Sequence, residues 1–332
     1  MNMLGLDIGY SNLKVAGIND GESYCDVLPA GAGPSSERAA AFNEENTPSI
    51  RVTIGGRPWD VGVPQSEFPT ISRQLSDDYS RTEQYLALFY AALKRNGAPH
   101  IDCLVTGLPY DIHKEGVESR RLVELMQGEH EINPGEKVVV KDVRVIPQPL
   151  GSFLSAIDEF PDYQEQIQED NILVIDPGFF SCDFVLIQEG RIIQNVSGHN
   201  CHAMSRLLET MSSDLRAAGA GKIAIGQLEQ RIRADNSSVF IGGKKQGLSE
   251  YTARARDAIA GQAIKEIRNA MRALGSSVNL VIITGGGAKL WEPAVKTNFP
   301  EAGVLVFGEP VGANARGFLA AAEGVVSNEQ AA

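Results

Sequence analysis

Cysteine is scarce in this sequence, and long hydrophobic runs are absent from it. Only four cysteines occur, and no two of them form a CxxC pair: Cys25, Cys103, Cys182 and Cys201. Cysteines this few and this far apart predict reduced, mostly buried thiols rather than a disulfide framework. No apolar run approaches the roughly 20 residues that a membrane-spanning helix needs, and the N-terminus shows no basic region or cleavage pattern of a signal peptide. The sequence therefore predicts a cytoplasmic protein without a membrane partner.

Positive charge is also in deficit. The chain has 30 Lys and Arg against 42 Asp and Glu, a formal net charge of −12. Such a surface repels nucleic acid and anionic membranes, so we expect no direct nucleic-acid contact, and any DNA would have to be reached through an adaptor. The length of 332 residues, with 43% hydrophobic and 22% charged residues, suits a globular protein with two domains.

The start of the chain carries the most informative pattern. Apolar residues alternate in two short runs and predict two strands, at Leu4, Leu6 and Ile8 and again at Leu13 and Val15. Around the turn between them lie an acid, a glycine, two short polar side chains and a lysine: Asp7, Gly9, Ser11, Asn12 and Lys14. Phosphate oxygens bind amides and an ammonium, and hydrated Mg²⁺ binds carboxylates. An ordinary hairpin turn uses the same residue types, so this segment alone leaves both interpretations open.

The same pattern recurs in the second half of the chain. Residues 172–187 again combine a strand, an Asp-x-Gly turn and a strand, with Asp176 and Gly178 in the places of Asp7 and Gly9. Each hairpin is followed by a third strand, here at 190–196, and then by helices. This repetition predicts a duplicated β-β-β-α unit, and two similarly folded halves that face each other across a cleft.

Hydrophobic periodicity places the remaining elements. Short continuous apolar runs predict strands buried on both faces at 101–106 and 279–284. Periodicity near 3.6 predicts helices at 81–96, 148–157, 203–217, 225–234, 248–274 and 313–322. The Gly-, Ala-, Ser- and Glu-rich residues 30–46 are expected to form an exposed loop or a partly mobile segment.

Three further patterns have simpler explanations than chemistry. Cys182, beside the second turn, is expected to be a small buried hydrophobe rather than a nucleophile. The run His199-Asn200-Cys201-His202 supplies too few ligands at unhelpful spacing for a metal site. Residues 242–247 lack the Walker spacing and are interpreted as a basic turn.

Five separated pieces occur in a fixed order along the chain: Asp7-x-Gly9-x-Ser11-Asn12-x-Lys14, Gln148 at a helix entry, Asp176-x-Gly178-x-x-Ser181-x-Asp183, Thr284-Gly285-Gly286-Gly287 and Asn314-Ala315-x-Gly317. This order resembles that of the actin/Hsp70/hexokinase superfamily: phosphate loop one, first connecting helix, phosphate loop two, adenosine loop, second connecting helix. Within it, the segments at 106–109 and 310–318 most resemble the ParM/StbA-type bacterial actin-like ATPases that segregate plasmids, and archaeal actin-like proteins are similar too.

The resemblance implies an α/β fold of two duplicated ribonuclease-H-like, actin-like ATPase domains around a nucleotide cleft. Domain I would comprise residues 1–157 and 310–332, and domain II residues 158–309. One departure stands out: the second loop has Pro177-Gly178-Phe179-Phe180 where many relatives carry a Gly-Gly pair.

The resemblance also implies ATP and Mg²⁺ as cofactors and assigns roles to individual residues. Asp7 and Asp176 would hold Mg²⁺ through its water shell, Lys14 would bridge the β- and γ-phosphates, and Gln148 would orient the attacking water. The other expected nucleotide-binding residues are Gly9, Tyr10, Ser11, Asn12, Gly178, Phe179, Phe180, Ser181, Asp183, Gly285, Gly286, Gly287 and Asn314, with Glu209 as a candidate for a ribose hydroxyl.

The implied function is an ATPase that polymerises head to tail with ATP and Mg²⁺ and destabilises its filament by hydrolysis. Its expected task is plasmid DNA segregation through a DNA-binding adaptor protein. Two alternatives remain: a non-polymerising scaffold ATPase of the same fold, or a small-molecule kinase such as a sugar kinase. A kinase needs a carboxylate base beside the acceptor hydroxyl, and the sequence offers no further well-placed Asp for that role.

Overall fold

The computed structural model describes residues 1–19, 21–39, 48–71, 78–221, 223–233, 238–273, 275 and 277–331. The chain forms two compact units, one of Met1–Gln168 with Phe307–Ala332 and one of Glu169–Val306. The first unit thus includes residues 158–168 and 307–309, which the sequence analysis assigned to domain II.

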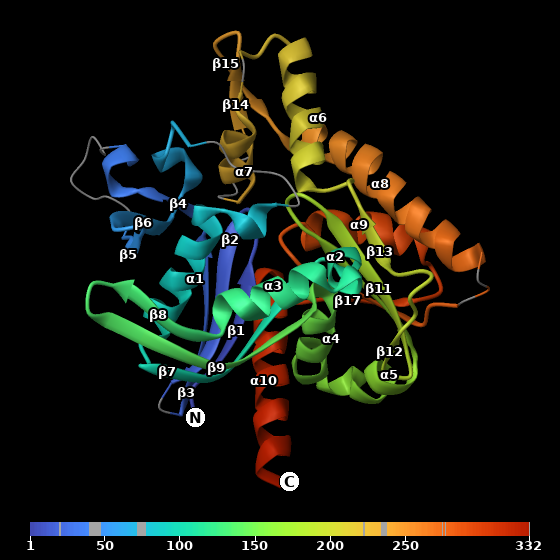
Figure 1. Ribbon diagram of the computed structural model, residues 1–332. Coiled ribbons are helices and arrows are strands. Elements are labelled where there is room, and N and C mark those ends of the chain that lie inside the picture. Colours follow the sequence, from blue (N-terminus) through green and yellow to red (C-terminus); the bar gives the residue numbers. More distant parts are fainter. Residues whose placement is uncertain are drawn as a thin grey trace. The chain divides into compact units, whose positions relative to one another are not determined.

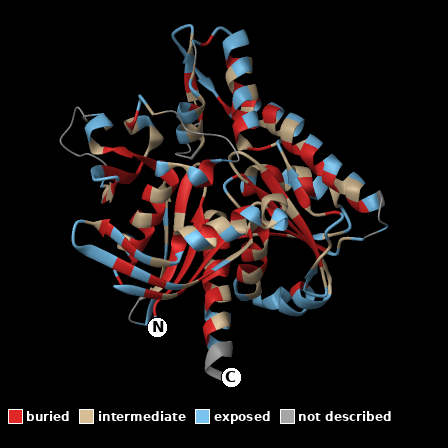
Figure 2. Ribbon diagram, in the orientation of Figure 1, coloured by how far each residue is buried: buried red, intermediate tan, exposed pale blue. Residues whose placement is uncertain are grey.

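In the described part of the first unit, six strands form one sheet in the order β3-β2-β1-β7-β9-β8 (Figure 1). Their bounds are β1 (Met3–Ile8), β2 (Asn12–Asn19), β3 (Glu22–Pro29), β7 (His100–Leu108), β8 (Gly128–Asn133) and β9 (Glu136–Pro147). β1 pairs antiparallel with β2 and parallel with β7, which runs parallel to β9. All six residues of β1 are buried, as expected for a strand covered on both faces (Figure 2).

Alternation along β1 assigns its two faces to different helices. Leu4, Leu6 and Ile8 lie in one core cluster with α1 (Glu83–Asn96), whereas Met3 lies in another with α10 (Ala313–Ala331). Gly5 shares the face of Met3, and a Cβ there would come within 2.2 Å of the Ala315 carbonyl oxygen. α10 therefore packs directly on the backbone of β1.

The first unit contains four more helices among the described residues. These are α2 (Tyr110–Glu115), α3 (Val117–Met126), α4 (Gln148–Glu159) and α5 (Gln164–Glu169), the last of which ends at the first residue of the second unit. α4 packs against α10 at two glycines, because a Cβ on Gly317 would lie 1.6 Å from the carbonyl oxygen of Gly151. Only glycines at these positions let the two helices approach so closely.

A small sheet, β4-β6-β5, corrects one expectation. It comprises β4 (Gly31–Pro34), β5 (Ile50–Ile54) and β6 (Arg57–Val63). All four residues of β4 are buried, so the first part of the expected exposed loop at 30–46 is a strand instead. The small residues of β4 predicted a loop, but they make room for packing. A Cβ on Gly33 would come within 2.5 Å of Ile71 and 2.8 Å of Phe68. Residues 40–46 of that expectation lie outside the described residues.

The second unit repeats the pairing pattern of the first. Its sheet has the order β12-β11-β10-β16-β17, with β13 also on β11. The bounds are β10 (Asn171–Pro177), β11 (Cys182–Gln188), β12 (Arg191–Ile192), β13 (Gly198–Asn200), β16 (Leu280–Ile283) and β17 (Gly303–Val306). β10 pairs antiparallel with β11 and parallel with β16, and β16 is parallel to β17. In the first unit, β1 likewise pairs antiparallel with β2 and parallel with β7, and β7 is parallel to β9. This confirms the predicted duplication, although the third strand is two short pieces rather than one at 190–196.

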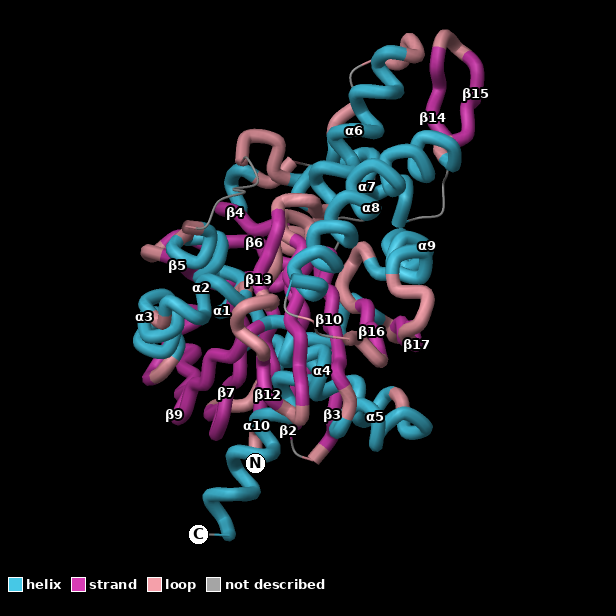
Figure 3. The backbone as a smooth tube through the Cα atoms, turned by 90° about the vertical axis from the view of Figure 1, so that its right-hand side faces the viewer, coloured by secondary structure: helices cyan, strands magenta, loops and turns pink. Residues whose placement is uncertain are grey.

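Helices and a hairpin complete the second unit: α6 (Met204–Ala217), α7 (Ile225–Arg233), α8 (Ser249–Ala273), α9 (Ala288–Asn298), β14 (Ser238–Ile241) and β15 (Lys244–Gly247). The hairpin lies beside α6 and α7 (Figure 1 and Figure 3). Gly242 and Gly243 take φ values of 55° and 78°, so the predicted basic turn is a two-residue hairpin turn.

None of the helices in the described ranges is both long enough and apolar enough to span a bilayer. All four cysteines are free thiols, but the expectation of mostly buried ones holds for half of them: Cys103 and Cys182 are buried, whereas Cys25 and Cys201 are exposed.

Candidate functional site

Asp7 lies at the end of β1 and is 1% exposed, and three side chains reach its carboxylate. Lys14 Nζ donates to Oδ2 at 2.9 Å, and Gln148 Nε2 donates to Oδ1 at 3.1 Å. Asn314 Nδ2 lies 3.5 Å from Oδ2, although it stands 307 residues away in the chain. The structure thus brings four predicted site residues together; we refer to Asp7, Lys14, Gln148 and Asn314 as the Asp7 cluster.

The strand register explains the position of Lys14. Asp7 and Lys14 are direct partners in the antiparallel pair of β1 and β2, so both project on the same face. The Gly9 amide donates to the Asn12 carbonyl at 3.0 Å and closes the turn between them. A Cβ on Gly9 would lie 2.9 Å from Lys14 Nζ, so the glycine leaves the room that the ammonium occupies. The buried carboxylate is therefore neutralised by a lysine of its own hairpin.

The crossing of α4 and α10 fixes the other two members. Gln148 begins α4 one turn before Gly151, and Asn314 lies near the start of α10 one turn before Gly317. The Ser152 hydroxyl donates to Asn314 Oδ1 at 2.5 Å, which turns the Asn314 amide nitrogen toward Asp7. Sequence reasoning missed Ser152. The available signal was its place four residues after Gln148, on the same face of the helix.

The tip of the first turn is held by an aromatic stack. Tyr10 stacks on Tyr79 with ring centroids 4.6 Å apart and an interplanar angle of 25°. Tyr79 in turn meets Tyr85 edge to face at 5.6 Å. The Ser11 carbonyl accepts from Ala30 N at 3.0 Å, and Asn12 is 5% exposed. Tyr79 was not predicted, because nothing local to it marks a contact with a turn so far away in the chain.

The second turn, residues 176–183, pairs two acids. Asp176 and Asp183 are direct partners between β10 and β11 and are 8% and 3% exposed. Ser181 Oγ donates to Asp183 Oδ2 at 2.7 Å. Asp183 thus occupies the place that Lys14 holds in the first hairpin. Two buried carboxylates on one face favour a cation, and this donor chemistry fits Mg²⁺, which binds oxygen ligands.

The second turn rests on the start of α6. The carbonyl of Gly178 accepts from Met204 N at 3.1 Å, and that of Phe179 accepts from Ser205 N at 2.9 Å. The Phe179 side chain packs against the core cluster formed by α6, α7 and α8. The aromatic residues that depart from the Gly-Gly pattern therefore include one that anchors the loop to the core. Phe180 follows it and is half-buried.

The glycine loop, residues 285–287, lies against the second turn. Gly285 has a φ of +72°, and a Cβ on it would lie 2.1 Å from Asp176 Oδ1. The Gly287 amide donates to the Pro177 carbonyl at 3.1 Å, and α9 begins at the next residue. Thr284, at the end of β16, is fully buried. The structure therefore brings the glycine loop and Asp176 together. Gly286, between Gly285 and Gly287 in the sequence, is exposed.

Glu209 lies outside the two turns and the glycine loop, whereas Cys182 belongs to the second turn. Glu209 is on an exposed face of α6, where it pairs with Arg206 at 3.1 Å. Cys182 has no exposed surface, and burial, followed by the Asp183 and Asp176 carboxylates, raises the pKa of its thiol well above the usual value. A thiol that stays protonated is a poor nucleophile, which agrees with the expectation of a buried small hydrophobe.

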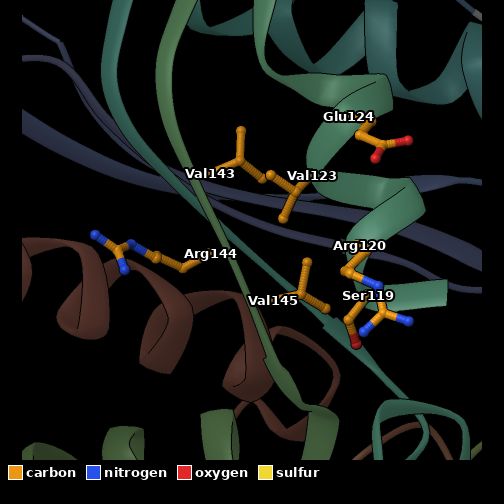
Figure 4. Close-up of a pocket in the computed structure, with 7 residues that line it drawn as sticks. All are labelled: Ser119, Arg120, Val123, Glu124, Val143, Arg144 and Val145. Carbon is orange, nitrogen blue, oxygen red and sulfur yellow. The ribbon is translucent and has the colours of Figure 1, made fainter. Parts of the chain in front are cut away.

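A hollow of about 380 Å³ lies elsewhere in the first unit, between α3 and β9 (Figure 4). Its apolar lining comes from Val123 of the helix and from Val143 and Val145 of the strand. Figure 4 shows Arg144 directed away from these valines, and its guanidinium pairs with Asp142 at 2.7 Å. The lining contains none of the predicted site residues, so this hollow is separate from the Asp7 cluster.

Comparison with known proteins gives matches to families and to solved structures. Residues 5–151 match the family of actin-like proteins, N-terminal domain, and residues 174–297 match the archaeal actin homologue MreB-like family, C-terminal. No curated protein sequence matches the chain.

Three solved structures illustrate the likeness. Ta0583, an archaeal actin homologue, is 20% identical, with 97% of this chain and 99% of that chain covered and a TM-score of 0.75. A 15-stranded ParM filament from Clostridium botulinum is 20% identical, with 97% and 99% covered and a TM-score of 0.72. Bacillus thuringiensis ParM with AMPPNP is 13% identical, with 99% of each chain covered and a TM-score of 0.62.

The two family matches follow one another along the chain and cover both duplicated units, and the solved structures match over nearly its whole length. The fold and the resemblance that the sequence indicated are thereby confirmed. The chain thus matches an actin-like family model in each of its two units, and it shares its fold with ParM proteins and an archaeal actin homologue.

Proposed function

We propose that this protein binds ATP with Mg²⁺, hydrolyses it and polymerises head to tail in the cytoplasm. We further propose that its filament moves plasmid DNA through a DNA-binding adaptor, since a chain of net charge −12 is poorly suited to hold DNA itself. The observation that carries the proposal is the Asp7 cluster, in which a buried carboxylate holds a lysine and two amides. Among proteins of the same fold, one structure is a ParM filament, one holds AMPPNP and one is a complex with ADP.

In this proposal the two hairpins contribute different groups to nucleotide binding. The first presents a lysine for phosphate oxygens, and the second presents two buried carboxylates for a cation. Asp176 and Asp7 would hold Mg²⁺ through water, with Asp183 beside Asp176, and the bound ion would neutralise charge on the phosphates. The glycine loop would receive the adenosine, since its backbone has no side chain to collide with the base.

Gln148 would orient the attacking water molecule in this proposal. Its amide nitrogen donates to Asp7, which leaves the amide oxygen as the acceptor for a proton of the attacking water. An amide cannot take up that proton as a strong base does, so turnover is expected to be slow. Lys14 would remain near the terminal phosphate and stabilise charge as the phosphoryl group leaves.

Gln148→Ala tests this assignment. Loss of the orienting amide should slow ATP hydrolysis on the order of 100-fold while the fluorescent-nucleotide affinity changes little. Gln194→Ala, at an exposed glutamine of the second unit, is the matched control and should hydrolyse ATP as the wild type does. An unchanged hydrolysis rate in Gln148→Ala would show that this residue does not orient the water.

Sedimentation with ATP, with ADP and without nucleotide tests the polymerisation. Nucleotide-dependent pelleting supports the filament. Hydrolysis without pelleting under any condition would support the scaffold ATPase instead, and hydrolysis stimulated by a sugar would support a kinase.

A further inference from the structure

The hairpin of β14 and β15 exposes an aromatic ring in the second unit. Phe240 is 69% exposed, the highest value among the exposed large hydrophobic side chains of the described residues. Its neighbour Val239 is 3% exposed and packs with α6, α7 and α8. Successive strand residues point to opposite faces, so Phe240 is directed away from that core. Aromatic side chains such as Phe are enriched in protein–protein interfaces relative to the rest of the surface.

The same hairpin is locally basic. Phe240 stands directly across from Lys245 in the strand register, and Lys244 adjoins the two-glycine turn. Both lysines are exposed, and residues 238–247 contain no acid. We refer to residues 238–247 as the basic hairpin; it is a positive patch on a chain whose net charge is −12.

A segment of the first unit has the opposite character. Residues 158–168, which lead from the end of α4 into α5, contain no base and four acids: Asp158, Glu159, Asp162 and Glu165. Asp162 and Glu165 are exposed, and Tyr163 between them is 39% exposed. We refer to residues 158–168 as the acidic segment. It offers an aromatic ring with carboxylates on either side.

We propose that the basic hairpin of one copy docks on the acidic segment of a second copy, with Phe240 against Tyr163 and the two lysines against Asp162 and Glu165. This inference rests on the proposed function, because it supplies one contact of the filament. Two chains of net charge −12 repel each other, so their association needs local patches of opposite sign. The two surfaces are different, so the contact is heterologous and can repeat along an open assembly.

Photo-crosslinking in the full-length protein tests the contact directly. A benzophenone amino acid replaces Phe240, and isotopically heavy and light protein are mixed so that mass spectrometry identifies links between different copies. Links from position 240 to residues 158–168 of another copy are expected. The same probe at Val139, which is 37% exposed on β9, serves as the control and should give no links to that segment.

Charge reversal gives a second, independent measurement. Lys244→Glu with Lys245→Glu should raise the critical concentration for pelleting on the order of tenfold, because two exposed ion pairs become repulsive. Adding Asp162→Lys and Glu165→Lys in the same chain should restore most of the loss. Lys114→Glu with Lys265→Glu makes the same change of charge at exposed lysines elsewhere and should pellet as the wild type does.

The outcomes separate this inference from the proposed function. Pelleting with ATP and links that avoid residues 158–168 would overturn the docking contact and leave the filament intact. Links to residues 158–168 in a protein that neither binds nor hydrolyses ATP would keep the contact and overturn the ATPase. Absence of any link between copies, or a charge-reversed chain that pellets as the wild type does, would also overturn the contact.

Discussion

Gly317→Ala should loosen the crossing of α4 and α10 and, with it, the Asp7 cluster. A Cβ at Gly317 would lie 1.6 Å from the Gly151 carbonyl oxygen, where an ordinary contact needs 3.4 Å or more. The obstacle is backbone, so the helices must separate by roughly 2 Å. Gln148 and Asn314 each lie one helical turn from this contact, and their distances of 3.1 and 3.5 Å to the Asp7 carboxylate depend on it.

The size of the effect follows from two opposing terms. Overpacking of this kind costs about 3 kcal/mol, and alanine in place of a helical glycine returns about 1 kcal/mol. The free energy of unfolding should therefore fall by about 2 kcal/mol, which lowers the melting temperature of a unit of this size by about 4–8 °C. Thermal unfolding followed by circular dichroism measures the shift, and nucleotide titration should show weaker binding as well.

Gly324→Ala supplies the matched control in the same helix. A Cβ at Gly324 meets no atom of the described residues within 4 Å, and the position is exposed. The same substitution there adds helix propensity without a clash, so the melting temperature should rise by about 2–4 °C. Equal shifts for Gly317→Ala and Gly324→Ala would refute the argument that the crossing depends on close backbone contact.

Two further outcomes are expected. Burial raises the pKa of Glu118, but hydrogen bonds from Arg121, Ser80 and Arg81 outweigh this effect and lower the pKa to about 2 from 4.5. The ionised Glu118 therefore contributes its full stabilisation above about pH 4.5. This contribution fades as the pH falls toward 2. Glu118→Gln should cost about 2 kcal/mol at pH 7 and much less near pH 2 in urea denaturation, and a loss independent of pH would contradict this. Asp183→Asn removes one of the two facing carboxylates, so the protein should bind ATP with Mg²⁺ roughly tenfold more weakly. The rise in melting temperature on adding ATP with Mg²⁺ should shrink accordingly. An undiminished rise would contradict the cation site.

Local pattern was sufficient for the hairpins, whereas the contact between Asp7 and Lys14 was not predicted and is explained by the strand register of the first hairpin. Both residues belong to one short hairpin, and its alternation fixes which side chains stand opposite each other. The duplication was also readable, because the second hairpin repeats the first. The short, buried strand β4 was not, since its glycines and alanine have the composition of a loop. Their burial depends on non-local packing, in which Gly33 lies against Phe68 and Ile71 and Gly31 lies against the backbone of Val63.

The sequence by itself therefore determined the two repeated hairpins, the acid at the end of each and the family to which the chain is similar. Tertiary structure alone decided which distant side chains meet them: Ser152 on Asn314, Tyr79 on Tyr10, and Gly285 against Asp176. The physical reason is range. Strand alternation and turn chemistry act between residues a few positions apart, whereas a helix crossing or an aromatic stack depends on how whole elements pack, which no short stretch of sequence encodes.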